Sequence, residues 1–432
     1  MSTTPPPDRD TLLDNIEAFL QQMTTSLLPE KETARGPGRP RILPALCLWA
    51  GLLGCVLRGF SSQLALWRLL SAKALWRYPC FPITDQAVYN RLERGGTAPL
   101  ETLFTHTSAL LAERVAPFAL ANLAPFAQQV VALDESTLDQ VARRLPALRS
   151  VPAGDDRLLP GKLAALFDIR RQQWRAVRFV AEARQNEKVL ARDLVASLPL
   201  GSLVLADLGY FGFAWFDWLH EQGHHYISRL RGKTSYTVQH VFYQQGDVFD
   251  GVVWLGAYRA DQAAHAVRLV TFRVGTSTYR YITDVLDPTV LPLAQITALY
   301  ARRWDIELAM NLIKRHLKLH LLWSAKTVVI QQQVWAVLII SQILQALRME
   351  IAGRAGVDPY EVSMALLVQY LPDMAREGQD PIALFVEQGR WARFIRPSTR
   401  TVTRAPTIPP DQIRLLPPDT VLQRPPRYAQ KP

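Results

Sequence analysis

The sequence has 432 residues, of which 49% are hydrophobic and 20% charged, which is typical of a globular protein and excludes a disordered chain. Its net charge of +11 favours a polyanionic partner, with nucleic acid first and an anionic membrane surface second. The three cysteines are too few and too poorly spaced for a disulfide framework or a zinc site, so we expect buried thiols in a reducing cytoplasm.

Residues 1–120 are predicted to form a helical, DNA-binding region. Apolar spacing indicates a short amphipathic helix over 8–29, and a basic linker follows at 31–41. Within the linker, Gly38-Arg39-Pro40 is similar to the core of an AT-hook, in which Arg39 would lie in a minor groove; a plain basic linker is the alternative. The uncharged stretch 42–57 is too short to cross a membrane, and we expect a buried helix there.

The segment around residue 85 resembles a helix-turn-helix. Thr84 or Asp85 would cap a helix whose outward side chains suit the reading of base edges in a major groove. These side chains are Gln86, Tyr89, Asn90 and Arg91. An ordinary helical hairpin is the alternative.

Residues 121–325 have the pattern of a mixed sheet with helices on its faces. The predicted order is a buried strand ending at Asp134, a hairpin of strands over 162–170 and 173–182, a helix over 186–198, a strand ending at Asp207, a helix over 211–222 and a strand over 225–231. Residues 232–285 alternate between polar and apolar side chains and predict an antiparallel β insertion of about four strands. A C-terminal helical region follows at 326–395, and a basic, proline-rich tail at 396–432 is expected to be extended and mobile.

The stretch 299–318 predicts one amphipathic helix that carries a line of charged side chains. Tyr300, Arg303, Glu307 and Lys314 fall on one stripe at helical spacing, and Asn311 and Lys318 join it. Apolar residues on the neighbouring stripe would anchor the helix on a core. One carboxylate among cations suits a site that holds a metal ion and a polyanion together, whereas a solvated charged face is the alternative.

This spacing of Tyr, Arg, Glu and Lys, with the context Arg303-Trp304 and Ile306-Glu307, resembles the helix that carries the last acidic residue in DDE transposases of the insertion-sequence-four family. The resemblance implies an α+β or mixed α/β fold. It comprises a ribonuclease-H-like mixed sheet flanked by helices, with an antiparallel β insertion, plus N-terminal and C-terminal helical regions. The order of acids on two strands and one helix, with an insertion before the helix, agrees with that pattern.

The resemblance assigns Asp134, Asp207 and Glu307 as catalytic residues that hold two Mg²⁺ ions, for which Mn²⁺ would substitute. Glu135, Asp139 and Asp217 are alternative acids close by. Each acid also has an ordinary explanation, because acids at strand ends are often turn residues or helix caps.

The resemblance further implies a DNA transposase that cleaves the ends of its own element and joins the 3′-hydroxyl to target DNA. Expected partners are terminal inverted repeats, target DNA and a second copy of the chain in a homodimer, with no membrane. The expected location is the bacterial cytoplasm, at the nucleoid when the protein is bound to DNA. The alternatives are a magnesium-dependent nuclease that does not transpose and an inactivated transposase that acts as a DNA-binding repressor.

The same resemblance gives the expected DNA contacts, which are Tyr300, Arg303, Lys314, Lys318 and Tyr279, with Arg39 and Arg91 from the N-terminal region. Some family members stack a flipped base on a tryptophan in the strand before the helix. The matching position here is Tyr279, which departs from that pattern although tyrosine also stacks on bases.

Overall fold

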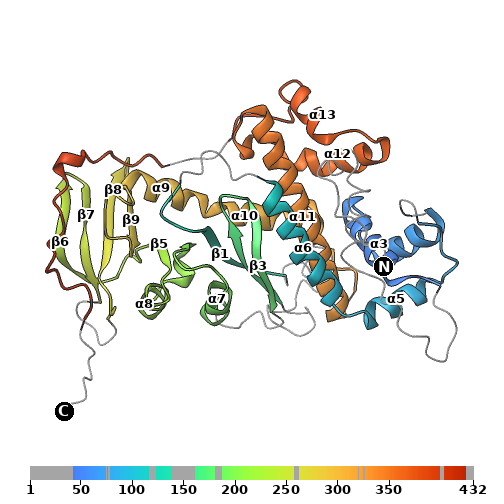
Figure 1. Ribbon diagram of the computed structural model, residues 1–432, viewed down its shortest axis with the longest axis horizontal. Coiled ribbons are helices and arrows are strands. Elements are labelled where there is room, and N and C mark those ends of the chain that lie inside the picture. The colour runs from blue at the N-terminus through green and yellow to red at the C-terminus, as the bar shows by residue number, and fades with distance from the viewer. Residues whose placement is uncertain are drawn as a thin grey trace, which may run out of the picture.

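The computed structural model describes residues 42–73, 75, 78–115, 123–138, 161–180, 187–256, 262–319, 321–324, 326–398 and 403–424. The expected helix at 8–29 and the AT-hook-like Arg39 lie outside these residues. The described chain is built around one large sheet, with helices against its faces and a helical region beyond one edge (Figure 1).

Nine strands form the sheet in the order β3-β2-β1-β4-β5-β9-β8-β7-β6. Their bounds are β1 Val130–Thr137, β2 Lys162–Asp168, β3 Gln173–Val180, β4 Leu203–Ala206, β5 His225–Arg229, β6 Tyr236–Gln245, β7 Val248–Leu255, β8 Val267–Val274 and β9 Ser277–Thr283. The first three strands are antiparallel neighbours, whereas β1, β4 and β5 run parallel. This is the ribonuclease-H-like arrangement, so the predicted fold class is confirmed.

The predicted β insertion is an extension of the same sheet. β9 pairs antiparallel with β5, and β8, β7 and β6 follow outward to the far edge. Figure 1 shows these strands in yellow, at the end of the molecule opposite the N-terminal helices. The four predicted strands are present, and pairing with β5 satisfies the backbone groups that would otherwise form an open edge.

Alternation along the strands gives the sheet two apolar faces. On β1, Val131 and Leu133 belong to the core covered by α7 Glu187–Val195 and α8 Phe213–Glu221. Val130 and Ala132 belong to the other core, together with α9 Leu293–Arg302, α10 Trp304–Asn311 and α11 Thr327–Ala355. Any residue of β1 can therefore be assigned to a face from its number.

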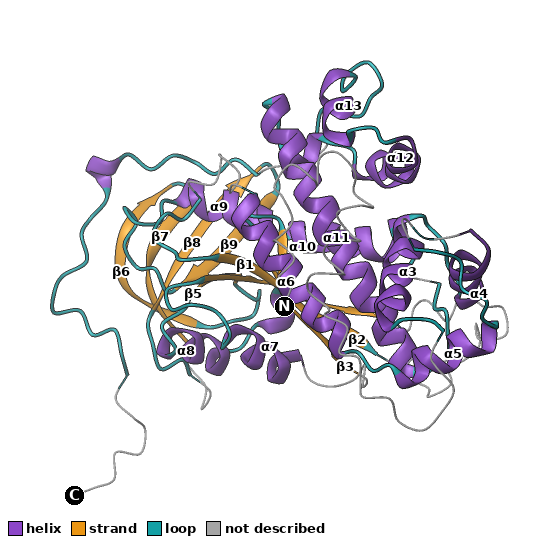
Figure 2. Ribbon diagram, turned by 45° about the vertical axis from the view of Figure 1, so that its right-hand side comes forward, coloured by secondary structure: helices purple, strands orange, loops and turns teal. Residues whose placement is uncertain are grey.

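The long helix α11 is the central support of the second core. It is the one helix among the described residues with the length and composition to cross a membrane, but 78% of its apolar window is buried inside the protein. α6 Ala98–Arg114 packs along it (Figure 2). Because α6 and the sheet both pack against α11, this helix is apolar on nearly every side.

The N-terminal region is helical, as predicted. It contains α3 Ala45–Leu57, α4 Gln63–Arg68, a π-helical turn Leu69–Lys73 and α5 Asp85–Arg94. α3 is the buried helix expected at 42–57. The Thr84 hydroxyl oxygen accepts a hydrogen bond from the Ala87 backbone N–H at 3.2 Å, which makes Thr84 the N-cap of α5.

The C-terminal region contains α12 Met364–Glu377 and α13 Pro381–Glu387, with short 3₁₀ turns at Pro359–Glu361 and Pro410–Gln412. The prediction of a mobile tail is wrong for 403–424, which runs back to the β insertion. The Arg414 N–H donates to the Phe242 carbonyl at 2.9 Å, and the Ala266 N–H to that of Leu422 at 2.8 Å. Leu416 and Leu422 cover the small core around Phe242, which provides an apolar reason for the tail to pack.

The helix predicted over 299–318 is present but is not uninterrupted. Arg303 joins α9 to α10 with helical dihedrals, φ −53° and ψ −33°, so the line from Tyr300 to Glu307 is preserved. A π-helical turn then occupies Leu312–His316, and Lys318 has φ +58° outside any helix. Because a π turn inserts a residue into the helical repeat, the expected stripe does not continue to Lys318.

Candidate active site

Asp134 and Asp207 lie side by side on neighbouring parallel strands. Leu133 of β1 pairs with Ala206, the last residue of β4, and the two aspartates are the residues that directly follow this pair. Neighbouring strands lie about 5 Å apart. Asp134 shares the face of Ala132, which is the face that α10 covers. The predicted strand end needs one correction, since β1 continues beyond Asp134 to Thr137 by pairing with β2.

The alternative acids are placed elsewhere or lie outside the described residues. Glu135 points to the opposite face of the sheet and pairs with Lys162 at 2.5 Å. Asp217, on α8, accepts hydrogen bonds from the backbone N–H groups of Ala264 and His265 at 2.8 and 3.0 Å. Asp139 is not among the described residues. Asp134 and Asp207 are therefore the pair that shares one edge and one face.

Glu307 faces this pair from α10. Its Oε1 accepts a hydrogen bond from Arg303 Nη2 at 2.7 Å, one helical turn earlier. The Arg303 side chain is largely buried, and its charge acts on Asp134 as well as on Glu307. Arg303 thus lies near two carboxylates, those of Asp134 and Glu307, and pairs directly with that of Glu307.

The pKa of Asp134 depends on the other two acids. Its pKa is raised to about 6, mainly by burial and to a smaller extent by the negative charges of Asp207 and Glu307, while the Glu135 N–H and the positive charge of Arg303 act in the opposite direction. A carboxyl group whose pKa is raised by burial and by like charges is typical of functional sites. Two of the acids predicted from the sequence, Asp207 and Glu307, therefore lie close enough to act on the third, Asp134, in the folded chain.

The donor set suits a hard divalent cation, because Mg²⁺ and Mn²⁺ take carboxylate oxygens. Among the described residues, however, no three acidic, histidine or cysteine side chains are already gathered closely enough to hold a metal ion. The Arg303 pairing of Glu307 is one reason. The chemistry of the residues fits a metal centre, and Glu307 would have to leave Arg303 to complete it.

The two lysines expected at the site have different positions. Lys314 Nζ donates to Ser136 Oγ at 2.5 Å and to the Thr137 carbonyl at 2.7 Å, so it reaches the end of β1 just beyond Asp134. Lys318 Nζ donates to the Gly59 carbonyl at 2.9 Å and links the turn after the π helix to the N-terminal region. The structure therefore brings Lys314 to the site and separates Lys318 from it.

The two tyrosines are supported by other aromatic rings. Tyr300 is 7% exposed, with its ring 5.0 Å from that of Tyr281 and 5.9 Å from the Arg303 guanidinium. Burial raises the pKa of its hydroxyl. Tyr279 is half-buried and stacks on Phe272 at 5.3 Å between centroids. Tyr300 is thus placed to hold Arg303, while one face of Tyr279 is already occupied.

Two side chains at the site were not assigned a role from the sequence. Arg229 ends β5, beside the end of β4, and its positive charge acts on Tyr300. Trp304 is 56% exposed on α10, with the Arg303 guanidinium 5.3 Å from its ring. The signal for Arg229 was its place at the end of a buried parallel strand, and the signal for Trp304 was its place beside Arg303 and off the apolar stripe.

The expected reading residues of α5 are only partly available. Gln86 and Asn90 are exposed and hydrogen-bond to each other at 3.0 Å. Tyr89 is half-buried against the core, and Arg91 turns back to donate to the Leu43 carbonyl. The prediction that Tyr89 and Arg91 both point outward is therefore wrong, because Tyr89 packs against the core and Arg91 donates to the Leu43 carbonyl.

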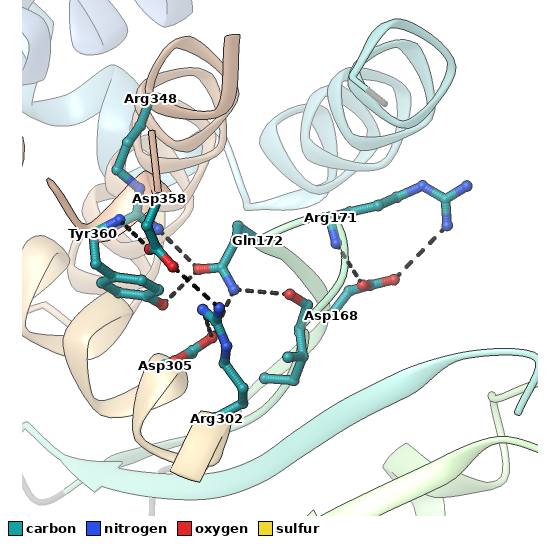
Figure 3. Close-up of polar contacts among 9 residues, drawn as sticks. Asp168, Arg171, Gln172, Arg302, Asp305, Arg348, Asp358 and Tyr360 are labelled. Carbon is teal, nitrogen blue, oxygen red and sulfur yellow. Dashed lines mark hydrogen bonds and ion pairs between the residues drawn. The ribbon is translucent and has the colours of Figure 1, made fainter. Parts of the chain in front are cut away.

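A buried polar network fixes α10 to the turn between β2 and β3 (Figure 3). Gln172, in the β2–β3 turn, is 1% exposed and has φ +55°. Its amide nitrogen donates to Asp305 Oδ2 at 2.8 Å, and its amide oxygen accepts from Arg348 at 2.8 Å and from the Tyr360 hydroxyl at 2.7 Å. Because Asp305 is two residues from Glu307, this network sets where α10 presents its carboxylate.

Comparisons with known proteins find a family model and solved structures that are similar to this chain. Residues 130–343 match the model of the transposase DDE domain family, a span that runs from β1 into α11. The chain therefore carries a DDE transposase domain. A cryo-EM structure of the piggyBac transposase synaptic complex with hairpin DNA is similar over 94% of this chain and 86% of that chain, with 9% sequence identity and a TM-score of 0.41. Comparison with curated proteins finds no match.

Proposed function

We propose that this protein is a cut-and-paste DNA transposase of the insertion-sequence-four type, which cleaves the ends of its own element and transfers the 3′-hydroxyl ends to target DNA. The observation that carries the proposal is the electrostatic effect of Asp207 and Glu307 on the buried Asp134, since the three acids come from sequence-distant elements. The matched DDE domain supports the same reaction class. The proposed catalytic residues are these three acids.

The three acids would also hold two Mg²⁺ ions, with Mn²⁺ as a substitute. When bound, such a pair activates an oxygen nucleophile and stabilises the leaving oxygen of a phosphodiester. The raised pKa of Asp134 implies that its carboxylate is destabilised without a cation beside it, so it favours cation binding at neutral pH.

Arg303 and Glu307 would exchange partners when DNA binds. In the structure they neutralise each other at 2.7 Å. A scissile phosphate offers Arg303 a second anion with bidentate geometry, and releasing Glu307 makes its oxygens available to a cation. The Tyr300 ring packs against the Arg303 guanidinium, and Lys314 adds a positive charge near the end of β1. These residues would position the phosphate rather than react with it.

The remaining DNA contacts follow from position. Exposed Gln86 and Asn90 suit contact with base edges, whereas Arg91 acts by fixing α5. Lys318 and Arg39 would supply phosphate contacts, and Tyr279 would stack a base on its free face. The proposed assembly is a homodimer on paired terminal repeats, in the cytoplasm and at the nucleoid when bound.

Two other functions are separable by experiment. A nuclease that does not transpose would cut the same DNA without joining it, and an inactivated transposase would bind without cutting. Short inverted repeats around the gene would favour transposition over both.

The test uses the full chain with DNA that carries its own element ends, target plasmid and Mg²⁺. We expect cleavage at the element ends and joined products, both lost in Asp207→Asn and Glu307→Gln while DNA binding persists. Cleavage without joining would leave the nuclease alternative. Binding without cleavage by the unmodified protein in Mg²⁺ and in Mn²⁺ would overturn the proposal.

A further inference from the structure

The turn after α13 holds a tryptophan and three arginines on the surface of the C-terminal region. Trp391 is 86% exposed, more than the other large apolar side chains of the described residues. The neighbouring arginines are exposed as well; they are Arg390, Arg393 and Arg396. A nearly bare indole is unusual, because large aromatic side chains are mostly buried in folded proteins.

The exposure of Trp391 does not come from a loosely held backbone. Phe394 stacks on Phe385 with ring centroids 4.3 Å apart, and the Ile395 N–H donates to the Gly389 carbonyl at 2.8 Å. A side chain at Gly389 would come within 2.7 Å of the Phe385 carbonyl oxygen, so the close turn requires glycine there. The turn is therefore anchored on the core on both sides of the tryptophan.

Arg393 gives the turn its direction. Its φ of +59° is in the left-handed region, which non-glycine residues rarely occupy, and its N–H bonds to the Arg390 carbonyl at 3.3 Å. This conformation lets Phe394 enter the core while Arg393 stays in solvent. The backbone that carries these side chains is thus fixed before any partner arrives, which lowers the entropy cost of binding.

The charge of the turn is not neutralised within the described chain. Other arginines pair with acids, as in Arg268–Asp250 at 2.6 Å and Arg303–Glu307 at 2.7 Å. Among the described residues, none of the three arginines beside Trp391 pairs with a carboxylate. Glu387 is the one acid in the segment 387–398. The turn consequently offers positive charge around an apolar ring.

We propose that this turn is a second DNA-binding site, separate from the acids, in which the arginines contact phosphates and Trp391 stacks on a base or lies against a sugar. Arginine and an exposed aromatic ring are the pair of side chains that holds nucleic acid without sequence preference. A twofold contact between copies of the chain would set the same arginines against each other, which disfavours that occupant.

The experiment measures DNA binding by the full chain in EDTA, so that cleavage does not enter and the proposed catalytic function is not required. The probes are a fluorescent random duplex, blunt or with a single-stranded tail, over a series of salt concentrations. Replacing the three arginines by glutamine should weaken binding at least about tenfold and reduce the salt slope by about 2 to 3. Trp391→Ala should weaken binding to the tailed duplex by roughly five- to 100-fold, and Trp391→Phe should retain most of it.

The matched control replaces Arg175, Arg178 and Arg192, which are exposed on β3 and α7, and removes the same net charge. An equal loss of affinity in this control would reduce the effect to overall charge and overturn the proposal. The second test is sedimentation of Trp391→Ala and Trp391→Phe. Dissociation of an oligomer with unchanged DNA affinity would assign the turn to a contact between copies, which also overturns it.

Discussion

Asp134 and Asp284 lie near opposite ends of the strands of the same sheet, and the fold shifts their pKa values in opposite directions. Asp134 lies near the carboxyl ends of β1 and β4, where burial and the charges of Asp207 and Glu307 raise its pKa to about 6. Asp284 follows β9, beside the amino end of β5. Burial alone would raise its pKa too, yet hydrogen bonds from His220 and His225 outweigh burial and lower it.

The difference separates a structural acid from a functional one. Asp284 Oδ2 lies 2.9 Å from His225 Nδ1 and 3.5 Å from His220 Nδ1, and its Oδ1 accepts from the Tyr226 N–H at 2.9 Å. Its partners stabilise the charged form, so nothing further is needed. Asp134 has other carboxylates as neighbours, and the Glu135 N–H and Arg303 do not offset its burial, so an added cation would further stabilise its charged form. Burial by itself therefore does not identify a site, whereas burial among like charges does.

The largest expected difference between the two acids is in activity. Asp134→Asn keeps the size of the side chain but removes its charge, so end cleavage should fall by on the order of 10³-fold, the several kcal/mol expected of metal-ion catalysis. DNA binding without metal should persist or tighten, because one negative charge facing phosphate is gone. Asp284→Asn is the matched control and should cleave within a few-fold of the unmodified protein under conditions where it is folded. Equal losses in the two variants would break the comparison.

The second prediction concerns metal and pH. Since a cation must replace the proton on Asp134, the half-saturating Mg²⁺ concentration for cleavage should fall as pH rises toward the pKa of about 6, and level off above it. Below that pKa the change should approach about tenfold per pH unit for one displaced proton. Cleavage rates over a Mg²⁺ series at several pH values test this. A half-saturation that is constant between about pH 5 and 7 would argue against Asp134 as a ligand.

The third prediction concerns the stability given by Asp284. Asp284→Asn should lower the free energy of unfolding by about 1–3 kcal/mol, because it weakens hydrogen bonds to a buried charge. The lowered pKa of Asp284 stabilises the fold above about pH 4 and that stability is lost as pH falls. The pKa values of His220 and His225 are raised by their hydrogen bonds to Asp284, so their share is complete below about pH 6.5 and lost above their folded pKa. Urea unfolding across pH should show this contribution vanish in the variant.

The smallest expected effect has the opposite sign. Because the folded state raises the pKa of Asp134, the unmodified protein loses stability as pH rises from about 4 through about 6. Asp134→Asn removes that loss and should stabilise the metal-free protein by about 1–2 kcal/mol at neutral pH, with no gain near pH 4. Chemical unfolding in EDTA at both pH values measures it. Destabilisation at neutral pH would mean that Asp134 is satisfied in the way Asp284 is.

The sequence by itself determined the order of elements and the residues that could form the site. The apolar runs that end at Asp134 and Asp207 predicted the buried strands β1 and β4. The spacing of Tyr300, Arg303 and Glu307 survived because Arg303 keeps helical dihedrals. These features depend on residues that are close together in the sequence, so short sequence patterns predict them.

Only the tertiary structure decided which candidates meet. The pairing of Leu133 with Ala206 brings together the two aspartates that directly follow this pair, and the strand face sends Glu135 to Lys162 instead. Gln172 in the β2–β3 turn holds Asp305 across 133 residues of sequence, a contact that no local pattern records. The π turn at Leu312–His316 removed Lys318 from the expected line, and the Leu43 carbonyl turned Arg91 inward. Strand register, helix irregularities and buried polar pairs depend on residues far apart in the chain, so they are settled when the core packs and not before.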